Sequence, residues 1–215
     1  MMEARKPDWA GLIRLVVVTP AGGPARGPVQ VAAAALAAGC RAVQLRDKEA
    51  SDREFAGLAR AVMRSCGEKG ALFFVNDRVD VASAVGADGV HLGAMDLRVE
   101  DARGVLGAAP IIGYSPEGLE DARAALQAGA DYLGVGPVFG TPTKADAGEP
   151  IGPDGLSLYV ADGAAPVLAV GGIDEGNALE AFRVGAAGVA VVSAVAGAAD
   201  MEEATRRLLE RIGKV

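Results

Sequence analysis

Short apolar runs alternate along this chain with longer segments in which apolar residues recur every three or four positions. Runs of four or five apolar residues are typical of buried strands, and the longer spacing is typical of helices with one buried face. The runs that we predict as strands are 14–18, 42–45, 71–75, 89–92, 110–113, 132–135, 167–170 and 188–192. The segments that we predict as helices are 28–38, 52–66, 79–85, 99–106, 117–128, 153–160, 175–183 and 201–212.

The strict alternation of strand and helix predicts a parallel sheet, because the chain returns to the same edge of such a sheet through a helical crossover. Glycine follows four of the predicted helices, at Gly39, Gly86, Gly129 and Gly185, where it can take the left-handed conformation that ends a helix. Eight such units in 215 residues favour an α/β fold of the (β/α)8 TIM-barrel type. A doubly wound open sheet has the same alternation and stays the alternative.

Composition agrees with this fold class. Hydrophobic residues make up 51% of the chain and aromatic residues only 4%, so the core is expected to consist largely of Ala, Val, Leu and Ile, with many glycines at the joints between elements. We expect a single domain over residues 1–215, with residues 1–12 as an N-terminal extension or cap. The formal net charge of −7 argues against broad affinity for nucleic acid or anionic membranes, so a phosphate site has to be local.

The two cysteines, Cys40 and Cys66, form neither a disulfide framework nor a metal motif, and we expect reduced thiols in the cytoplasm. The apolar run 12–18 is shorter than the roughly 20 residues that a membrane-spanning helix needs, and no cleavable signal pattern surrounds it. Residues 1–9 and 19–28 are predicted to be irregular. Whether the protein forms a homo-oligomer is left open.

The segment 136–144 combines chemistry that suits an anion. It follows a predicted strand and reads Gly136-Pro137-Val138-Phe139-Gly140-Thr141-Pro142-Thr143-Lys144. Glycine lets backbone N–H groups approach a phosphate, threonine adds hydroxyl donors and lysine adds a positive charge. A solvated surface loop has the same composition and is the other interpretation.

The predicted second strand ends in alternating polar residues, Gln44, Arg46 and Lys48. Alternate residues of an extended segment project to one side, so an amide, a guanidinium and an ammonium group can face one substrate. In a (β/α)8 barrel the loops after the strands form the active site. These side chains are also compatible with a strand end exposed to water.

Two predicted strand ends carry carboxylates. Asn76 and Asp77 follow the third strand and Asp96 follows the fourth, so Asp77 and Asp96 can hold a hard cation such as Mg2+ through oxygen ligands. Asn76 and Asp77 are equally the residue types that cap a helix, here one beginning at Arg78. The only histidine, His91, also ends the fourth strand, and for it we favour a structural role over catalysis.

The last strand ends complete the candidate site. Ser115 follows the fifth strand, Gly171-Gly172 the seventh, and Val192-Ser193 the eighth. Many such barrels build a phosphate site after strands seven and eight from backbone N–H groups. The two glycines are also explained by tight turns alone.

In combination these motifs are recognisable, and the chain resembles the thiamine phosphate synthase family from about Leu15 to its last helix. The motifs that carry the resemblance are Val43-Gln44-Leu45-Arg46-Asp47-Lys48, Asn76-Asp77-Arg78-Val79-Asp80-Val81-Ala82, Gly86-Ala87-Asp88-Gly89-Val90-His91-Leu92-Gly93, the segment 134–144 and Val170-Gly171-Gly172-Ile173. The resemblance implies a transferase that joins 4-amino-2-methyl-5-hydroxymethylpyrimidine diphosphate to a thiazole phosphate. Thiamine phosphate and diphosphate would be its products, with Mg2+ as cofactor and a dissociative substitution as its course.

The resemblance also implies a role for each site residue. The pyrimidine diphosphate would be bound by Gln44, Arg46, Lys48, Asn76, Ser115 and Lys144. Among these, Arg46, Lys48, Ser115 and Lys144 would be catalytic. Mg2+ would be held by Asp77 and Asp96, and the thiazole phosphate by Thr141, Thr143, Gly172, Val192 and Ser193.

Three positions depart from the family pattern. Ala94 replaces the common Gln after His-Leu-Gly, Pro20 replaces an Asp after Val-Thr, and Pro116-Glu117 follows Ser115 where a His-containing region is usual. Three other functions stay open. They are a thiazole tautomerase on the same fold, another phosphate-binding barrel enzyme such as a sugar-phosphate epimerase, and a non-catalytic sensor of thiamine precursors.

Overall fold

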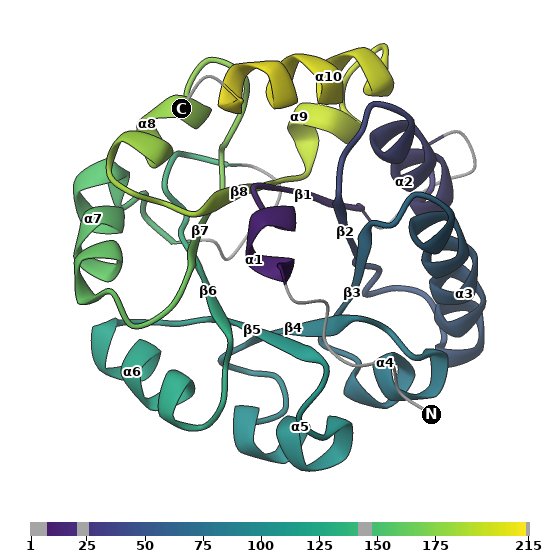
Figure 1. Cartoon of the computed structure of the whole chain (residues 1–215), viewed down its shortest axis with the longest axis horizontal. Coiled ribbons are helices and arrows are strands. Elements are labelled where there is room, and N and C mark those ends of the chain that lie inside the picture. The colour runs from purple at the N-terminus through teal and green to yellow at the C-terminus, as the bar shows by residue number, and fades with distance from the viewer. Residues whose placement is uncertain (1–7, 21–25, 142–147, 214–215) are drawn as a thin grey trace.

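The computed structural model describes residues 8–20, 26–141 and 148–213. It is a closed barrel of parallel strands in which each strand pairs with the next along the chain and β1 pairs with β8 (Figure 1). The strands are β1 Leu15–Val18, β2 Ala42–Leu45, β3 Leu72–Asn76, β4 Gly89–Gly93, β5 Ile111–Ser115, β6 Tyr132–Val135, β7 Val167–Val170 and β8 Gly188–Val191. The (β/α)8 prediction is confirmed, and closure through β1 and β8 excludes the open doubly wound sheet.

Helices form a ring around the barrel (Figure 1). The helices in chain order are α1 Trp9–Leu12, α2 Pro28–Ala37, α3 Asp52–Glu68, α4 Val79–Val85, α5 Val99–Leu106, α6 Leu119–Gln127, α7 Gly152–Asp162, α8 Ala178–Arg183, α9 Ser193–Ala196 and α10 Met201–Ile212. Two of these, α1 and α9, were not predicted. Each has only four residues, too few for a helical period to be visible in the sequence.

Two predicted helices begin later than expected, for local reasons. The helix expected over 117–128 starts at Leu119, because Gly118 is still fully extended. The helix expected over 175–183 starts at Ala178, because Asp174 accepts hydrogen bonds from the backbone N–H groups of Gly176 and Asn177 and so forms a turn first. Turn-forming side chains compete with the helix for these backbone groups.

The glycines after the four helices behave as predicted. Gly39, Gly86, Gly129 and Gly185 all have φ between +75° and +105°, a region that side chains with a Cβ disfavour. Each glycine therefore ends its helix and turns the chain towards the next strand.

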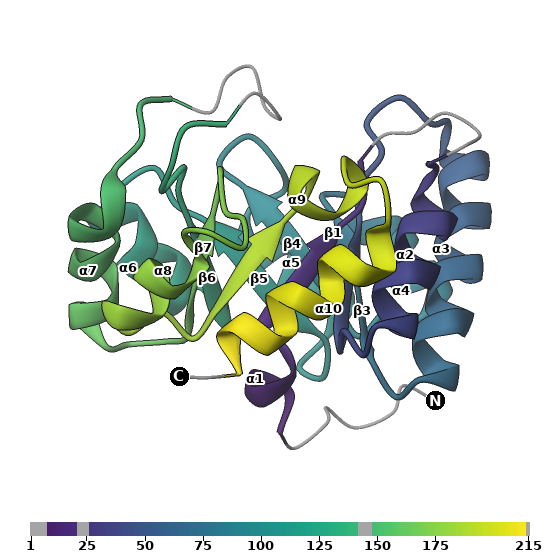
Figure 2. The same ribbon diagram turned by 90° about the horizontal axis from the view of Figure 1, so that it is seen from above.

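Successive side chains of each strand point to opposite faces of the sheet, and this produces two separate hydrophobic cores. One lies between the sheet and the helices. The other fills the barrel interior with residues such as Val16, Leu72, Phe74 and Tyr132. Helix α1 lies over one end of the barrel, at the front of Figure 1 and the bottom of Figure 2, where Trp9 packs against this inner core. That end is closed, so a site is left to the opposite end, where α9 lies.

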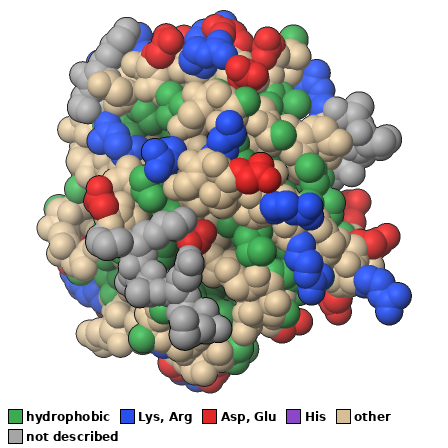
Figure 3. Space-filling model, turned by 45° about the vertical axis from the view of Figure 1, so that its right-hand side comes forward, with side chains coloured by type: hydrophobic (Ala, Val, Ile, Leu, Met, Phe, Trp, Pro, Cys, Tyr) green, Lys and Arg blue, Asp and Glu red, His purple; other side chains and the backbone are tan. Residues whose placement is uncertain are grey.

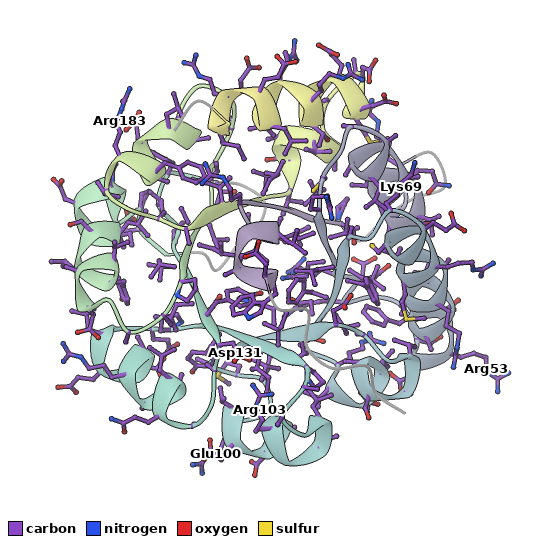
Figure 4. All side chains as sticks on the ribbon, in the orientation of Figure 1. Arg53, Lys69, Glu100, Arg103, Asp131 and Arg183 are labelled. Carbon is purple, nitrogen blue, oxygen red and sulfur yellow. The ribbon has the colours of Figure 1, made fainter. Side chains whose placement is uncertain are left out.

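Ion pairs outside the barrel stabilise the connections near α5. Arg103 on α5 donates to the Asp131 carboxylate at 2.8 Å and to the carbonyls of Gly129 and Pro110 at 2.7 and 2.6 Å. Figure 4 shows Arg103 and Asp131 pointing toward one another, whereas Arg53 on α3 points away from the barrel. This network tethers the start of β6 to a helix and serves the fold.

The outer surface is mixed in charge. On the face in Figure 3, acidic and basic side chains lie interspersed among apolar and neutral ones. Within the described residues, no helix combines the length and the apolar character that crossing a bilayer requires.

Candidate active site

A cavity of about 260 Å³ lies inside the barrel and at the ends of its strands. Its wall brings together most of the residues that the sequence indicated. The predicted residues that line it are Gln44, Arg46, Lys48, Asn76, Asp96, Ser115, Thr141, Gly172, Val192 and Ser193. The barrel therefore gathers these strand ends, which lie far apart in the sequence, around one space.

Three predicted residues do not line this cavity as described. Asp77 lies beside it but is not part of its wall. Thr143 and Lys144 fall outside the described residues, with the rest of segment 142–147. Their proposed roles stay predictions.

Alternation along the strands explains why these side chains point inward. Val16 and Val18 of β1, and Leu72 and Phe74 of β3, belong to the inner core. The next inward position of β3 is Asn76, which lines the cavity. Because the period of a strand is two, the polar residue that ends each inward row forms the floor of the site.

The loop after β2 is held by Thr19, which the sequence reasoning missed. Thr19 is fully buried and donates its backbone N–H to the Gln44 carbonyl at 2.9 Å. Its hydroxyl oxygen accepts the Arg46 backbone N–H at 3.1 Å. Thr19 thus continues the pairing of β1 with β2 by one residue and fixes the direction in which Arg46 leaves the strand.

Arg78 braces the same loop from the other side. Its guanidinium donates to the carbonyls of Ala50 at 2.7 Å and Asp47 at 3.3 Å, and it pairs with Asp52 at 3.2 Å. It also lies 4.4 Å above the centre of the Phe55 ring, a favourable cation–π contact. The loop that carries Lys48 is therefore tied to the residue that follows Asp77.

The capping interpretation of Asn76 and Asp77 is wrong. Asn76 is the last residue of β3, and α4 starts at Val79 without a side-chain capping hydrogen bond. Asp77 has φ of +56°, and the Arg78 N–H donates to the Asn76 carbonyl at 2.7 Å across it. The chain therefore turns sharply at Asp77, a strained conformation of the kind that collects at functional sites.

The charge of Asp96 influences the ionisation of Asp77. Burial raises the pKa of Asp77, the negative charge of Asp96 raises it further, and Lys48 opposes both effects. The Asn76 amide donates to the Asp77 carboxylate at 2.8 Å, and the Gly93 backbone N–H donates to Asp96 at 2.7 Å. Two carboxylates held in mutual repulsion suit a hard divalent cation.

The described residues contain no group of three or more His, Cys, Asp or Glu side chains placed to hold a metal. A cation at Asp77 and Asp96 would therefore take its remaining ligands from water and substrate oxygens. Mg2+ is usually bound in this way, through one or two carboxylates and substrate phosphates.

His91 connects two other cavity residues. One ring nitrogen, Nδ1, lies 3.0 Å from the Tyr132 hydroxyl and the other, Nε2, lies 2.8 Å from the Ser115 hydroxyl. Burial lowers the pKa of His91 to about 4, with a smaller opposing effect from Asp96. The imidazole is therefore neutral near pH 7. Tyr132 was missed as a site residue, although it occupies an inward strand position.

The two glycines after β7 form a tight turn at the cavity. Gly171 and Gly172 have φ of +87° and +65°, as tight turns require, and both line the cavity. A Cβ on Gly172 would lie 2.6 Å from the Gly140 carbonyl oxygen. The Asn177 amide donates to the Gly172 carbonyl at 2.7 Å, so the orientation of this peptide is fixed.

The final strand leads directly into a short helix. Val192 accepts the first hydrogen bonds of α9, from the N–H groups of Val195 and Ala196. Arg26 donates to the carbonyls of Ala196 and Ala198 at 3.0 and 2.8 Å, which places a cation at the C-terminal end of α9. Val192 and Ser193, where this helix begins, line the cavity, and the phosphate site expected there stays a prediction.

Fold and site together define a (β/α)8-barrel protein with one cavity at its strand ends, lined by cationic side chains, hydroxyls and glycine backbone. Residues 15–195 match the family described as thiamine monophosphate synthase. The chain belongs to this family.

Individual relatives agree. The chain is 46% identical to a thiamine-phosphate synthase of Moorella thermoacetica, over 95% of this chain and 96% of that protein. It is 49% identical to the thiamine biosynthesis bifunctional protein ThiM/ThiE of Symbiobacterium thermophilum, over 86% of this chain but only 38% of that longer protein. Among solved structures, thiamine phosphate pyrophosphorylase from Pyrococcus furiosus superposes with a TM-score of 0.86 at 40% identity, covering 95% of this chain and 98% of that one.

Proposed function

We propose that this protein is a thiamine phosphate synthase, a transferase that joins the pyrimidine diphosphate to the thiazole phosphate and releases diphosphate. The observation that carries the proposal is the shared cavity. Arg46, Lys48, Asp96 and Ser115 meet on its wall with the glycine turn after β7. Family membership and the names of the relatives support the same activity.

One side of the cavity suits the pyrimidine diphosphate. Gln44 and Asn76 are the amides there, and they can hydrogen-bond the aminopyrimidine and its diphosphate. Arg46 and Lys48 supply positive charge, and Ser115 supplies a hydroxyl. We assign Lys144 to the same diphosphate, on the resemblance alone.

Asp77 and Asp96 are the proposed Mg2+ ligands. Their carboxylates fit a hard cation because each is anchored by a neighbouring N–H donor and the charge of Asp96 acts on Asp77. When bound, Mg2+ would neutralise charge on the leaving diphosphate. Asp77 and Asp96 themselves would keep the cation beside Lys48.

The opposite side suits the thiazole phosphate. Thr141, Gly172, Val192 and Ser193 line the cavity there, and Thr143 is assigned with them from the resemblance. The last three can use backbone groups, since Gly172 is held by Asn177 and Ser193 begins α9. One cavity thereby offers an anion site for each substrate.

The chemistry asks for positioning and charge neutralisation. Loss of diphosphate leaves a cation that the aminopyrimidine ring stabilises, and the thiazole nitrogen attacks with its own lone pair. No side-chain base is needed for that attack. The structure is compatible with this, because His91 is neutral and bonded on both sides, and burial raises the pKa of the Cys40 thiol to about 11, which leaves it unreactive.

The proposal includes three further expectations, on domain organisation, partners and location. We propose that residues 1–215 act as one catalytic domain, with residues 1–12 as an extension or cap that includes α1. The partners are small-molecule substrates. Buried positions for both Cys40 and Cys66 are compatible with the proposed cytoplasmic location.

The test is an assay of the purified chain with both substrates and Mg2+, in which thiamine phosphate is quantified. We expect product only when both substrates are present. A folded sample that binds the thiazole phosphate but forms no thiamine phosphate would favour a tautomerase or a precursor sensor. The tautomerase would isomerise the thiazole phosphate alone, and the sensor would leave both compounds unchanged.

A further inference from the structure

Three side chains from adjacent strands form one hydrogen-bonded row inside the barrel. Tyr132 begins β6, His91 lies on β4 and Ser115 ends β5. The Tyr132 hydroxyl lies 3.0 Å from His91 Nδ1, and His91 Nε2 lies 2.8 Å from the Ser115 oxygen. The row therefore runs along the inner wall of the barrel, and all three residues line the cavity.

The barrel makes room for this row by omitting two side chains. A Cβ on Gly113 would lie 2.1 Å from the Tyr132 ring, and a Cβ on Gly134 would lie 2.8 Å from the His91 ring and 3.3 Å from the Ser115 oxygen. Both glycines lie on strands, where glycine weakens pairing and often marks a close approach. The row is thus built into the sheet.

Aromatic packing fixes the buried end. The Tyr132 ring contacts Phe74 edge-on with centroids 5.9 Å apart, and Trp9 of α1 at 6.3 Å. Tyr132 is only 1% exposed. These ring contacts fix the direction of the phenol, with its hydroxyl at His91 Nδ1.

Counting donors and acceptors sets the direction of the row. In the part of the chain that the structure describes, His91 Nδ1 is the one hydrogen-bond partner of the Tyr132 hydroxyl. If Nδ1 carried a proton and donated it, the phenol proton would have no acceptor among the described protein groups, which is costly for a side chain that is 1% exposed. The phenol therefore donates, Nδ1 accepts, and the imidazole proton lies on Nε2.

The tautomer of His91 also decides the hydrogen-bond role of Ser115. With its proton on Nε2, His91 donates to the Ser115 oxygen, and the serine's own proton is left to point elsewhere. Ser115 is partly exposed and lines the cavity. A hydroxyl that already accepts a hydrogen bond is also a better donor, since chains of hydrogen bonds polarise one another.

We propose that Tyr132 and His91 are positioning residues. Tyr132 locks His91 in its Nε2–H tautomer, and His91 in turn makes Ser115 a hydrogen-bond donor to an anion in the cavity. That this anion is the departing diphosphate rests on the proposed function. His91 then acts by holding Ser115 and not as an acid or a base.

The tautomer can be observed directly, because His91 is the only histidine in the chain. A tag-free sample labelled with 15N-histidine gives one pair of imidazole nitrogen signals near pH 7. We expect Nε2 to carry the proton and Nδ1 to be bare in the wild type, and the Nδ1–H form to appear in Tyr132→Phe. A protonated Nδ1 in the wild type would overturn the proposal.

Coupling to Ser115 is tested by a double-mutant cycle on kcat. Loss of one hydrogen bond of ordinary strength predicts that Tyr132→Phe lowers kcat about tenfold. In a Ser115→Ala background the same change should have no further effect, because the group being positioned is gone. An equal loss in both backgrounds would show a merely structural tyrosine and contradict the coupling.

Tyr114→Phe is the matched control. The Tyr114 hydroxyl donates to Asp121 outside the cavity, so its loss should leave kcat unchanged in both backgrounds. Binding of inorganic diphosphate with Mg2+ separates this inference from the proposed function. Weaker diphosphate binding in Tyr132→Phe supports the row even in a protein that makes no thiamine phosphate. Unchanged binding in a folded Tyr132→Phe sample counts against it.

Discussion

Asp77 combines an unfavourable backbone conformation with a partly buried carboxylate. It is the single non-glycine residue with positive φ within the described part of the chain, and its carboxylate is partly buried near Asp96. Both features cost free energy, by roughly 1–3 kcal/mol for the backbone. Such a cost is expected where the geometry of a carboxylate matters more than stability.

Replacing Asp77 tests the proposed metal pair. Asp77→Asn keeps the left-handed backbone, which Asn tolerates, but removes the charge. We expect Mg2+ affinity, measured by titration of activity, to fall on the order of 100-fold. Asp80→Asn, on the exposed face of α4, is the matched control and should behave as wild type.

The direction of the Asp77 pKa shift adds a pH test of the same residue. A carboxylate must be ionised to bind Mg2+, so its raised pKa makes Mg2+ affinity fall as pH is lowered, earlier than for an ordinary Asp. Asp77→Asn should lose this part of the pH dependence. Identical profiles for the two proteins would contradict the assignment.

His91 makes a separate prediction about stability. Its pKa is about 4 when folded and 6.5 when unfolded, so below pH 6.5 the unfolded chain binds the proton first. Stability is therefore intact above pH 6.5 and is lost as the pH falls towards 4, by up to about 3 kcal/mol. Denaturant unfolding of wild type and His91→Gln at pH 7 and pH 4.5 measures the difference.

Other titrating groups, such as Asp77, are common to both chains and largely cancel in that comparison. The wild type should lose more stability than His91→Gln on acidification. A greater loss in His91→Gln would mean that His91 is not held neutral in the folded protein.

Residue type and place at a strand end were sufficient to predict from the sequence that Gln44, Arg46, Asn76 and Ser115 lie around one cavity. They did not identify Thr19 or Tyr132. Their roles depend on partners 27 and 41 residues away, and no local pattern shows such pairings. An inward position on a predicted strand was the only signal for Tyr132.

At the scale of elements, neighbouring loops hold one another in place. Arg78 ties the loop after β2 to the start of α4 through two carbonyls, a carboxylate and an aromatic ring. The residues that it orders include those flanking Lys48. Its guanidinium touches no cavity residue through these contacts, so its effect on a ligand is indirect.

Arg78→Met should therefore loosen the diphosphate side of the cavity. We expect affinity for Mg2+–diphosphate to fall about tenfold, with thiazole phosphate affinity little changed, in calorimetric titrations. The fall reflects loss of charge-assisted hydrogen bonds of about 1.5–3 kcal/mol each, partly recovered by relaxation. Arg60→Met, on the exposed side of α3, is the control, and equal weakening of both ligands would contradict the prediction.

The turn after β7 is sensitive in a different way. Gly172→Ala introduces a Cβ at φ of +65° and 2.6 Å from the Gly140 carbonyl oxygen, so the loops after β6 and β7 must separate. We expect weaker thiazole phosphate binding and a loss of stability of about 1–3 kcal/mol, measured by titration and thermal unfolding.

Gly57→Ala is the matched control for that change. Gly57 lies inside α3 with no atom within 4 Å of the added Cβ, so alanine should stabilise the helix by roughly 0.5–1 kcal/mol. Equal effects of the two substitutions would contradict the special role given to Gly172.

Most element boundaries were predictable because each apolar run ends in glycine or a polar residue. The helices over Val79–Val85, Val99–Leu106 and Met201–Ile212 match their predicted bounds. At the starts of α6 and α8, turn geometry at Gly118 and Asp174 replaced the first predicted helical residues, whereas α3, α7 and β5 each end two residues later than predicted. Four-residue helices such as α9 are set by packing and capping, which periodicity does not report.

At the scale of the whole molecule, closure of the barrel converts scattered strand ends into one site. The pairing of β1 with β8 brings Val16 beside Ala190. This long-range contact could not be predicted from the alternation of strand and helix, because a closed barrel and an open sheet have the same alternation. Closure also explains why one end is filled by α1 while the other holds the cavity. The site is thus a property of the complete ring.

The most direct measurement is the amount of thiamine phosphate and diphosphate formed in the same sample by the purified chain. With both substrates and Mg2+ present, we expect the two products to appear one for one, and neither to appear when a substrate or Mg2+ is omitted. Diphosphate released without thiamine phosphate, or no product from a folded protein that binds both substrates, would contradict the proposal that this cavity joins them.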